Sequence, residues 1–201
     1  EFAASCLRGV LEAGYEVAAV YTQPDRPKGR KGELCASPVK ELALSEGIPV
    51  YQPERIRRKA EVETLRNLRP DLILVAAYGQ ILSKAILDMA PCINAHASLL
   101  PHYRGSSPIQ RAIAAGDAVT GVTAMRMNEG VDTGNIIFTR EVPITDQDTG
   151  DSLEEKLAQA GAEALVAVLK AREAGDDLVG TPQDESQATH APMLSREDGK
   201  M

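Results

Sequence analysis

The stretch LILVAAY at residues 72–78 decides the fold class, because it is the most strand-like segment of the chain. It is a continuous apolar run of residues that favour extended backbone, and Pro70 and Asp71 lead into it. Runs of this kind are typical of strands buried on both faces of a sheet. We therefore expect residues 72–78 at the centre of a sheet.

Outward from this stretch, segments with strand character alternate with segments that have a helical period. We expect further strands at residues 16–21, 48–53, 92–95, 121–127 and 136–142, and helices at residues 2–11, 39–46, 54–68, 83–89, 106–115 and 148–173. Such alternation predicts an α/β fold, Rossmann-like and doubly wound, whose sheet is mostly parallel with helices on both faces. Doubly wound domains normally begin with a strand, whereas a helix comes first here. We therefore expect that the chain lacks its first strand.

Two polar segments lie outside this pattern. Residues 22–36 are rich in Pro, Gly, Lys and Arg, which predicts a long loop without regular structure. Residues 179–201 are polar and irregular, and we expect an edge segment and linker there, following one domain at residues 1–178.

The composition is that of a soluble globular protein, with 43% hydrophobic and 25% charged residues. No apolar run approaches the roughly 20 residues that span a bilayer, and no signal-like segment opens the chain. We expect a cytoplasmic monomer that does not contact membranes. The widely spaced Cys6, Cys35 and Cys92 predict reduced thiols rather than disulfides or a metal knuckle. A net charge of -7 disfavours broad attraction to nucleic acid, so binding to RNA would need a local basic patch.

Candidate chemical groups cluster after the strand expected at residues 92–95. Asn94 and His96 are two residues apart, so their side chains point to the same face of an extended chain. Ligands of doubly wound sheets bind at the carboxyl ends of strands, which is where this pair lies. The loop at residues 101–105 follows, and a glycine-flanked loop at residues 128–134 carries Asp132. Ordinary turn hydrogen bonds for the pair, and an ordinary hairpin turn for the acidic loop, are the structural alternatives.

Together, Asn94, His96 and Asp132 supply an amide donor, a titratable ring and a carboxylate, and no Ser or Cys is placed as a nucleophile. This set favours direct acyl transfer: Asn and His stabilise an oxyanion, Asp manages a proton, and no covalent intermediate is needed. The three histidines, at positions 96, 102 and 190, are too far apart in the sequence to indicate a zinc site, so we expect no metal.

The segments INAHASLLPHYRG at residues 93–105 and GVDTG at residues 130–134 resemble the signature of the folate-dependent formyltransferases. The resemblance implies that Asn94, His96 and Asp132 are the catalytic residues and act on the formyl carbon of 10-formyltetrahydrofolate. It further implies folate contacts, many through main-chain groups, from Tyr78, Gly79, Gln80, Ile81, Leu82, Ser98, Leu99, Leu100, Pro101, Gly130 and Val131. It also implies a formyltransferase catalytic domain followed by an OB-like domain that this chain does not contain.

The acceptor has to be argued from the basic loop at residues 24–40, which resembles the insertion with which methionyl-tRNA formyltransferases hold the tRNA acceptor stem. The resemblance implies initiator methionyl-tRNA as the partner. The expected tRNA contacts are Arg26, Lys28, Arg30, Lys31, Lys40 and Arg104, the last of which would reach the acceptor or fix its own loop. A solvated, mobile loop explains the composition equally well. Other acceptors (water, an amino-sugar nucleotide or glycinamide ribonucleotide) and a non-catalytic tRNA- or nucleotide-binding domain are the alternatives.

Overall fold

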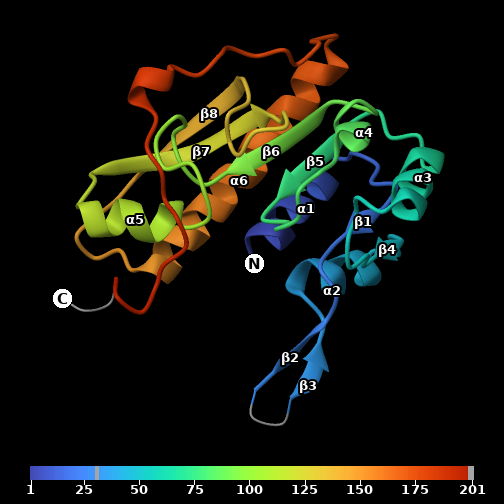
Figure 1. Cartoon of the computed structure of the whole chain (residues 1–201), viewed down its shortest axis with the longest axis horizontal. Coiled ribbons are helices and arrows are strands. Elements are labelled where there is room, and N and C mark those ends of the chain that lie inside the picture. The colour runs from blue at the N-terminus through green and yellow to red at the C-terminus, as the bar shows by residue number, and fades with distance from the viewer. Residues whose placement is uncertain (30–31, 199–201) are drawn as a thin grey trace.

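A computed structural model describes residues 1–29 and 32–198 of the chain. Its larger sheet has the order β5-β6-β7-β8 and consists of β5 (Ile73–Ala76), β6 (Cys92–His96), β7 (Val119–Arg126) and β8 (Ile136–Pro143) (Figure 1). The pair β5 and β6 is parallel, whereas β6–β7 and β7–β8 are antiparallel. The predicted α/β class is confirmed, but this sheet is mixed rather than mostly parallel. The β7–β8 pair is antiparallel because a single loop reverses the chain between the two strands.

A second, two-stranded parallel sheet pairs β1 (Val20–Tyr21) with β4 (Val50–Tyr51). A cavity of about 920 Å³ is lined by residues of both β1 and β5. Within the described residues β5 pairs with β6 alone and is an edge strand of the larger sheet. The prediction that it lies at the sheet centre is wrong. The absence of a first strand stays a prediction.

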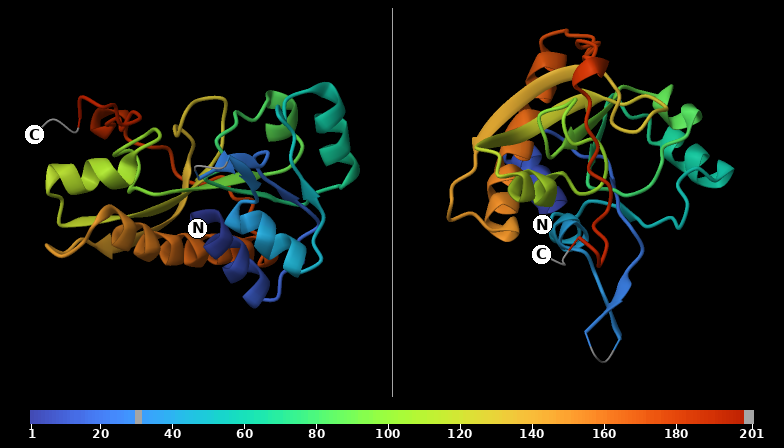
Figure 2. Two further views of the ribbon diagram at one scale, coloured as in Figure 1. Left: turned by 90° about the horizontal axis from the view of Figure 1, so that it is seen from below. Right: turned by 60° about the vertical axis from the view of Figure 1, so that its left-hand side comes forward.

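The longest helix, α6 (Gly150–Glu173), runs along one face of the larger sheet and packs against α1 (Phe2–Glu12) (Figure 2). It begins at Thr149, whose hydroxyl accepts a hydrogen bond from the amide of Ser152, while the Ser152 hydroxyl bonds back to the Thr149 amide in a capping box. The two helices approach closely at Gly9, where an added Cβ atom would lie 2.8 Å from the Cβ of Ala162. The core between α1, α6 and the sheet is mainly aliphatic and includes Phe2, Ile93, Val122, Leu153, Leu157, Leu165 and Val168.

The other expected helices are also present: α2 (Pro38–Ser45) is shifted by one residue, and α3 (Lys59–Asn67), α4 (Lys84–Leu87) and α5 (Pro108–Ala115) are shorter than expected. The expected loop at residues 22–36 instead contains an antiparallel hairpin of β2 (Arg26–Lys28) and β3 (Glu33–Cys35). All residues of both strands are exposed, and the hairpin projects from the body of the protein (Figure 1). Because neither face is buried, the sequence has no alternating apolar pattern from which the hairpin could be predicted.

The segment after α6 crosses the edge of the larger sheet and returns to the loop after β6. Thr181 forms a β-bridge with Ile136 and His190 forms one with Arg104, while Leu178 and Ala191 are fully buried. A short 3₁₀ helix, η1 (Glu185–Gln187), lies between these bridges. Through these two bridges, residues 179–191 lie against the domain, within the part of the chain expected to be an edge segment and linker. None of the helices in residues 1–29 and 32–198 is long and apolar enough to cross a membrane.

Candidate active site

Asn94 and His96 lie on β6, which is held between β5 and β7. As predicted, they occupy alternate positions of one strand and so face the same side. His96 is buried and Asn94 is half-buried. Because β5 and β6 are parallel, the loop that follows β5 and the loop that follows β6 lie at the same end of the sheet.

The His96 ring is held from two sides. Its Nε2 atom lies 2.8 Å from the backbone oxygen of Tyr103, and its Nδ1 atom lies 3.7 Å from Oδ2 of Asp132. A carbonyl oxygen only accepts, so Nε2 must carry the hydrogen of this bond. The structure therefore brings together two of the three predicted catalytic residues, although they are distant in sequence, and directs Nδ1 of the ring toward the carboxylate.

Asp132 has a left-handed backbone with φ of 53°, which is uncommon for a residue with a side chain. Its Oδ2 atom accepts a hydrogen bond of 2.8 Å from the amide of Gly105. In the same loop, a Cβ atom added to Gly134 would lie 1.6 Å from the backbone oxygen of Arg126, so only glycine fits there. The loop is therefore more than a hairpin turn, because its acidic side chain is held toward His96.

The expected folate-binding segment at residues 98–101 is fixed by a residue that the sequence did not indicate. The Thr123 hydroxyl on β7 donates to the backbone oxygen of Ser98 at 2.7 Å and accepts from the amide of Leu100 at 3.0 Å. Thr123 is fully buried. Its only sequence signal is a polar residue between Val122 and Ala124 in a mainly apolar strand.

The loop after β5 contains the other expected folate-binding segment, residues 78–82. Its side chains lie in different surroundings: Leu82 is buried in the core, whereas Ile81 is 75% exposed. Gln80 is directed toward the loop after β4, where it accepts from the amide of Ile56 at 2.8 Å and donates to the oxygen of Pro53 at 3.0 Å. Gln80 therefore braces the loop. Val131, at the tip of the acidic loop, is 68% exposed, so an apolar side chain is exposed on each of these two loops.

The residues expected to bind tRNA lie in different surroundings. Arg26 and Lys28 are exposed on the projecting hairpin, whereas Arg30 and Lys31 lie outside the described residues. Lys40 forms an ion pair of 2.7 Å with Asp25, and the bonds from Lys40 and Gln52 lower the pKa of that carboxyl.

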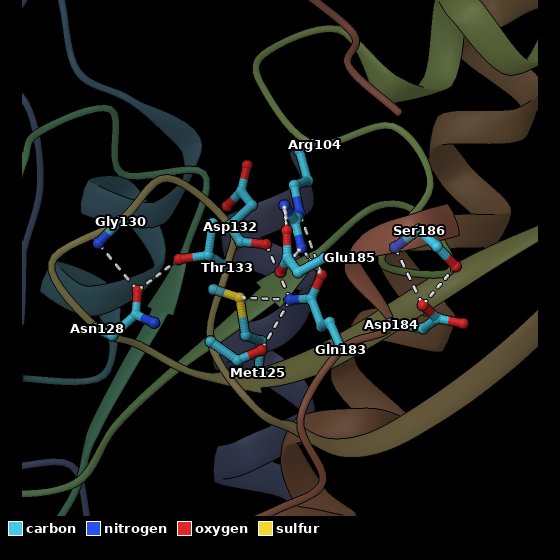
Figure 3. A network of polar contacts seen from close by, with 11 residues as sticks. Arg104, Met125, Asn128, Gly130, Asp132, Thr133, Gln183, Asp184, Glu185 and Ser186 are labelled. Carbon is cyan, nitrogen blue, oxygen red and sulfur yellow. Dashed lines mark hydrogen bonds and ion pairs between the residues drawn. The ribbon is translucent and has the colours of Figure 1, made fainter. Parts of the chain in front are cut away.

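The prediction that Arg104 contacts tRNA requires a correction. It is 4% exposed, and its guanidinium is bonded to Gln183 and Glu185, so it cannot reach a phosphate without breaking these bonds. Its burial favours the other role considered for it, fixing the loop. Gln183 and Glu185 belong to the segment expected to be a linker, and Figure 3 shows them grouped with Arg104 and Asp132.

The cysteines are not placed for nucleophilic chemistry at this site. All three are free, and Cys6 and Cys92 are buried. Burial raises the pKa of Cys6 to about 12 and that of Cys92 to about 11, so both stay protonated at neutral pH. In the part of the chain that the structure describes, no group of three or more His, Cys, Asp and Glu residues is arranged to hold a metal ion.

A family model described as formyl transferase matches residues 3–169. The chain belongs to the formyl transferase family. The methionyl-tRNA formyltransferase of Marinobacter nauticus is 51% identical in an alignment of 201 positions that covers 99% of this chain and 64% of that protein. The protein of the same name from Agathobacter rectalis is 52% identical with the same coverage. The chain thus spans just under two thirds of the length of these relatives.

Two solved structures share the fold of this chain. Phosphoribosylglycinamide formyltransferase from Streptococcus pneumoniae superimposes with a TM-score of 0.70 at 27% identity, covering 85% of this chain and 94% of that one. HypX from Aquifex aeolicus in complex with tetrahydrofolic acid gives a TM-score of 0.65 at 22% identity, covering 78% of this chain and 27% of that one. At that identity the HypX likeness shows the fold alone. The family match confirms the resemblance inferred from residues 93–105 and 130–134.

Proposed function

We propose that this chain carries the catalytic site of an enzyme that transfers a formyl group from 10-formyltetrahydrofolate to the α-amino group of initiator methionyl-tRNA, in translation initiation. The observation that carries the proposal is the placement of Asn94 and His96 at the end of β6 with the Asp132 carboxylate against the ring. Identity of about half to methionyl-tRNA formyltransferases across the whole chain supports this acceptor over the others. A cytoplasmic monomer is part of the same proposal.

The residues at the carboxyl ends of β5 and β6 fit a folate. Exposed Ile81 and Val131 offer apolar surface on two loops, which suits the faces of an aromatic ring system. Ala77 and Gly79 have left-handed backbones, with φ of 49° and 77°, so successive peptide groups of the loop after β5 turn in different directions. Main-chain donors and acceptors from this loop would hold the polar edge of the ring. When bound there, 10-formyltetrahydrofolate supplies the formyl group as an activated acyl donor.

Each of the three catalytic residues has a distinct role in this proposal. No hydrogen bond to the Asn94 side chain is formed within residues 1–29 and 32–198, so its amide is available to donate to the formyl oxygen as negative charge develops there. Because Nε2 of His96 donates to Tyr103, only Nδ1 is left to face the reacting centre, and it stabilises the oxyanion beside Asn94 when the ring carries a second proton on Nδ1. Asp132 lies on the Nδ1 side, where its carboxylate accepts the proton that the attacking amine loses, directly or through water.

The test is labelled formyl transfer from 10-formyltetrahydrofolate to initiator methionyl-tRNA, with formate release to water measured in parallel. Formylation of tRNA that greatly exceeds hydrolysis supports the proposal. Formate release without tRNA formylation would assign the same three residues to a hydrolase or to another acceptor. Inactivity in both reactions, with tRNA still bound, would support a binding domain and overturn the catalytic proposal.

A further inference from the structure

The side chain of Gln183 connects the acidic loop to the loop after β6, although it comes from the segment that follows α6. Its Nε2 atom donates to the backbone oxygens of Asp132 at 2.9 Å and Gly134 at 2.7 Å. Its Oε1 atom accepts from Nη2 of Arg104 at 2.8 Å and from Nε at 3.1 Å. Gln183 is 8% exposed, so these bonds are formed away from solvent. Figure 3 shows the amide between Asp132 and Arg104.

The Arg104 guanidinium is held on its other side by Glu185. Nη2 lies 2.7 Å from Oε1 and Nη1 lies 3.0 Å from Oε2 of that carboxylate, a bidentate pair. The bond to Glu185 raises the pKa of Arg104, and the bond to Arg104 lowers the pKa of Glu185. Both groups are therefore charged throughout the range in which the protein would work, and the guanidinium stays fixed for Gln183.

The backbone of Arg104 is held by the same C-terminal segment. Its amide donates to the oxygen of Thr189 at 2.9 Å, and its oxygen accepts from the amide of Ala191 at 2.6 Å. The two residues beside Arg104 are the ones that contact the proposed catalytic pair. The oxygen of Tyr103 accepts from His96, and the amide of Gly105 donates to the Asp132 carboxylate. One network of residues 183–191 thus reaches both members of the pair.

We infer that Gln183 is a positioning residue of the formyl transfer site, which holds the backbone of Asp132 so that its carboxylate stays against Nδ1 of His96. This inference rests on the proposed function. Asp132 needs such support because its left-handed backbone, with φ of 53°, is an unfavourable conformation for a non-glycine residue. An amide is the side chain that suits the position, because it donates twice to carbonyls while it accepts from a guanidinium.

Two substitutions separate the hydrogen bonds that the Gln183 amide donates from those that it accepts. Gln183→Met keeps the approximate volume and removes every hydrogen bond of the amide. Gln183→Glu keeps the acceptor for Arg104 but places a carboxylate oxygen against the two carbonyls. Gln187→Met is the matched control, because Gln187 is exposed in the same segment.

The first measurement is steady-state formyl transfer to initiator methionyl-tRNA. For Gln183→Met we expect kcat to fall by on the order of tenfold to 100-fold, as small displacements of catalytic groups do, with KM for either substrate changed less than threefold. Gln183→Glu should lower kcat in the same way, and the control should match the parent protein. If Gln183→Met fails to fold, Gln183→Glu carries the test.

The second measurement needs no substrate. The NMR chemical shifts of the His96 ring nitrogens, recorded at one fixed pH, report the place of the Asp132 carboxylate near Nδ1, and variants of His102 and His190 identify the signal among the three histidines. We expect these chemical shifts to change in both Gln183 variants and not in the control. A lower melting temperature with unchanged kcat and unchanged His96 chemical shifts would overturn the inference, because Gln183 would then be only structural. If the parent protein does not formylate tRNA but the His96 chemical shifts still respond to Gln183, the positioning role stands and the proposed function fails.

Discussion

The Nε2 atom of His96 lies 2.8 Å from the backbone oxygen of Tyr103, so the nitrogen that carries the hydrogen points away from Asp132. This bond fixes the orientation of the ring and leaves Nδ1 on the side of the carboxylate. In a free histidine ring the two tautomers interconvert, so the hydrogen can lie on either nitrogen. The different contacts of the two His96 nitrogens therefore depend on the loop at residues 101–105. The C-terminal segment holds that loop in place.

Asn94→Ala tests the proposed oxyanion donor. Removal of one such donor typically lowers the rate by about 100-fold to 1000-fold, and we expect kcat for tRNA formylation to fall in that range. KM for 10-formyltetrahydrofolate should change little, because the bond strengthens as charge develops on the oxygen. Asn67→Ala is the control, since Asn67 is exposed at the end of α3. A loss of less than tenfold would contradict the assigned role.

Thr123→Val tests whether the loop at residues 98–101 is held from β7. The substitution keeps the shape of the side chain but leaves the buried amide of Leu100 and the oxygen of Ser98 without their partner. We expect urea denaturation to show a loss of about 1–3 kcal/mol in the free energy of unfolding, together with a higher KM for 10-formyltetrahydrofolate. The equally buried Thr120, on the same strand, provides Thr120→Val as a control that should leave this KM unchanged.

Much of the fold could be predicted from local sequence patterns. The apolar period of residues 148–173 predicts α6 to within two residues of its observed start, because its apolar stripe faces the core from Leu153 to Val168. The strand expected at residues 16–21 is observed only as Val20–Tyr21. Within residues 1–29 and 32–198 it pairs with β4 alone, because a cavity rather than a strand lies between it and β5.

The candidate site was predictable only in part. Asn94 and His96 could be predicted as partners because they share one strand, and Asp132 because it lies in a recognisable motif. Gln183 could not, since its contacts to Arg104 and Asp132 span 79 and 51 positions of sequence. A polar, irregular segment has the same composition whether it is a solvated linker or a brace for an active site. Only the tertiary structure distinguishes the two.

The Asp148 carboxylate predicts how stability depends on pH. Lys156 donates to it at 2.8 Å, and the amide of Thr145 and the hydroxyl of Ser152 donate at the same distance. These bonds hold the pKa of Asp148 well below its ordinary value of 3.8. A lowered pKa in the folded state means stability that is present above that ordinary value and is lost progressively as the pH falls from it toward the lower pKa of the folded state. We expect Asp148→Asn to reduce the decline of melting temperature between about pH 5 and pH 3.

The control for that experiment is Asp146→Asn, because Asp146 is exposed two residues before Asp148. The melting temperature of this variant should follow the parent protein across the same pH range. If both variants decline as steeply as the parent, the hydrogen bonds to Asp148 do not contribute to acid stability.

The exposed basic residues of the β2–β3 hairpin predict that substitutions there affect the binding of tRNA and not that of the folate. Arg26 and Lys28 project from the body of an acidic protein, where phosphate contacts would supply affinity without reading sequence. We expect Arg26→Ala and Lys28→Ala each to raise KM for initiator methionyl-tRNA and to reduce the slope of log affinity against log salt by about one. KM for 10-formyltetrahydrofolate should stay constant, because the hairpin extends away from the larger sheet. Glu33→Gln, on the opposite strand, removes a charge of the other sign and should lower KM for tRNA or leave it unchanged. Equal changes in the KM values of both substrates would show that the hairpin acts through the fold rather than through the phosphates.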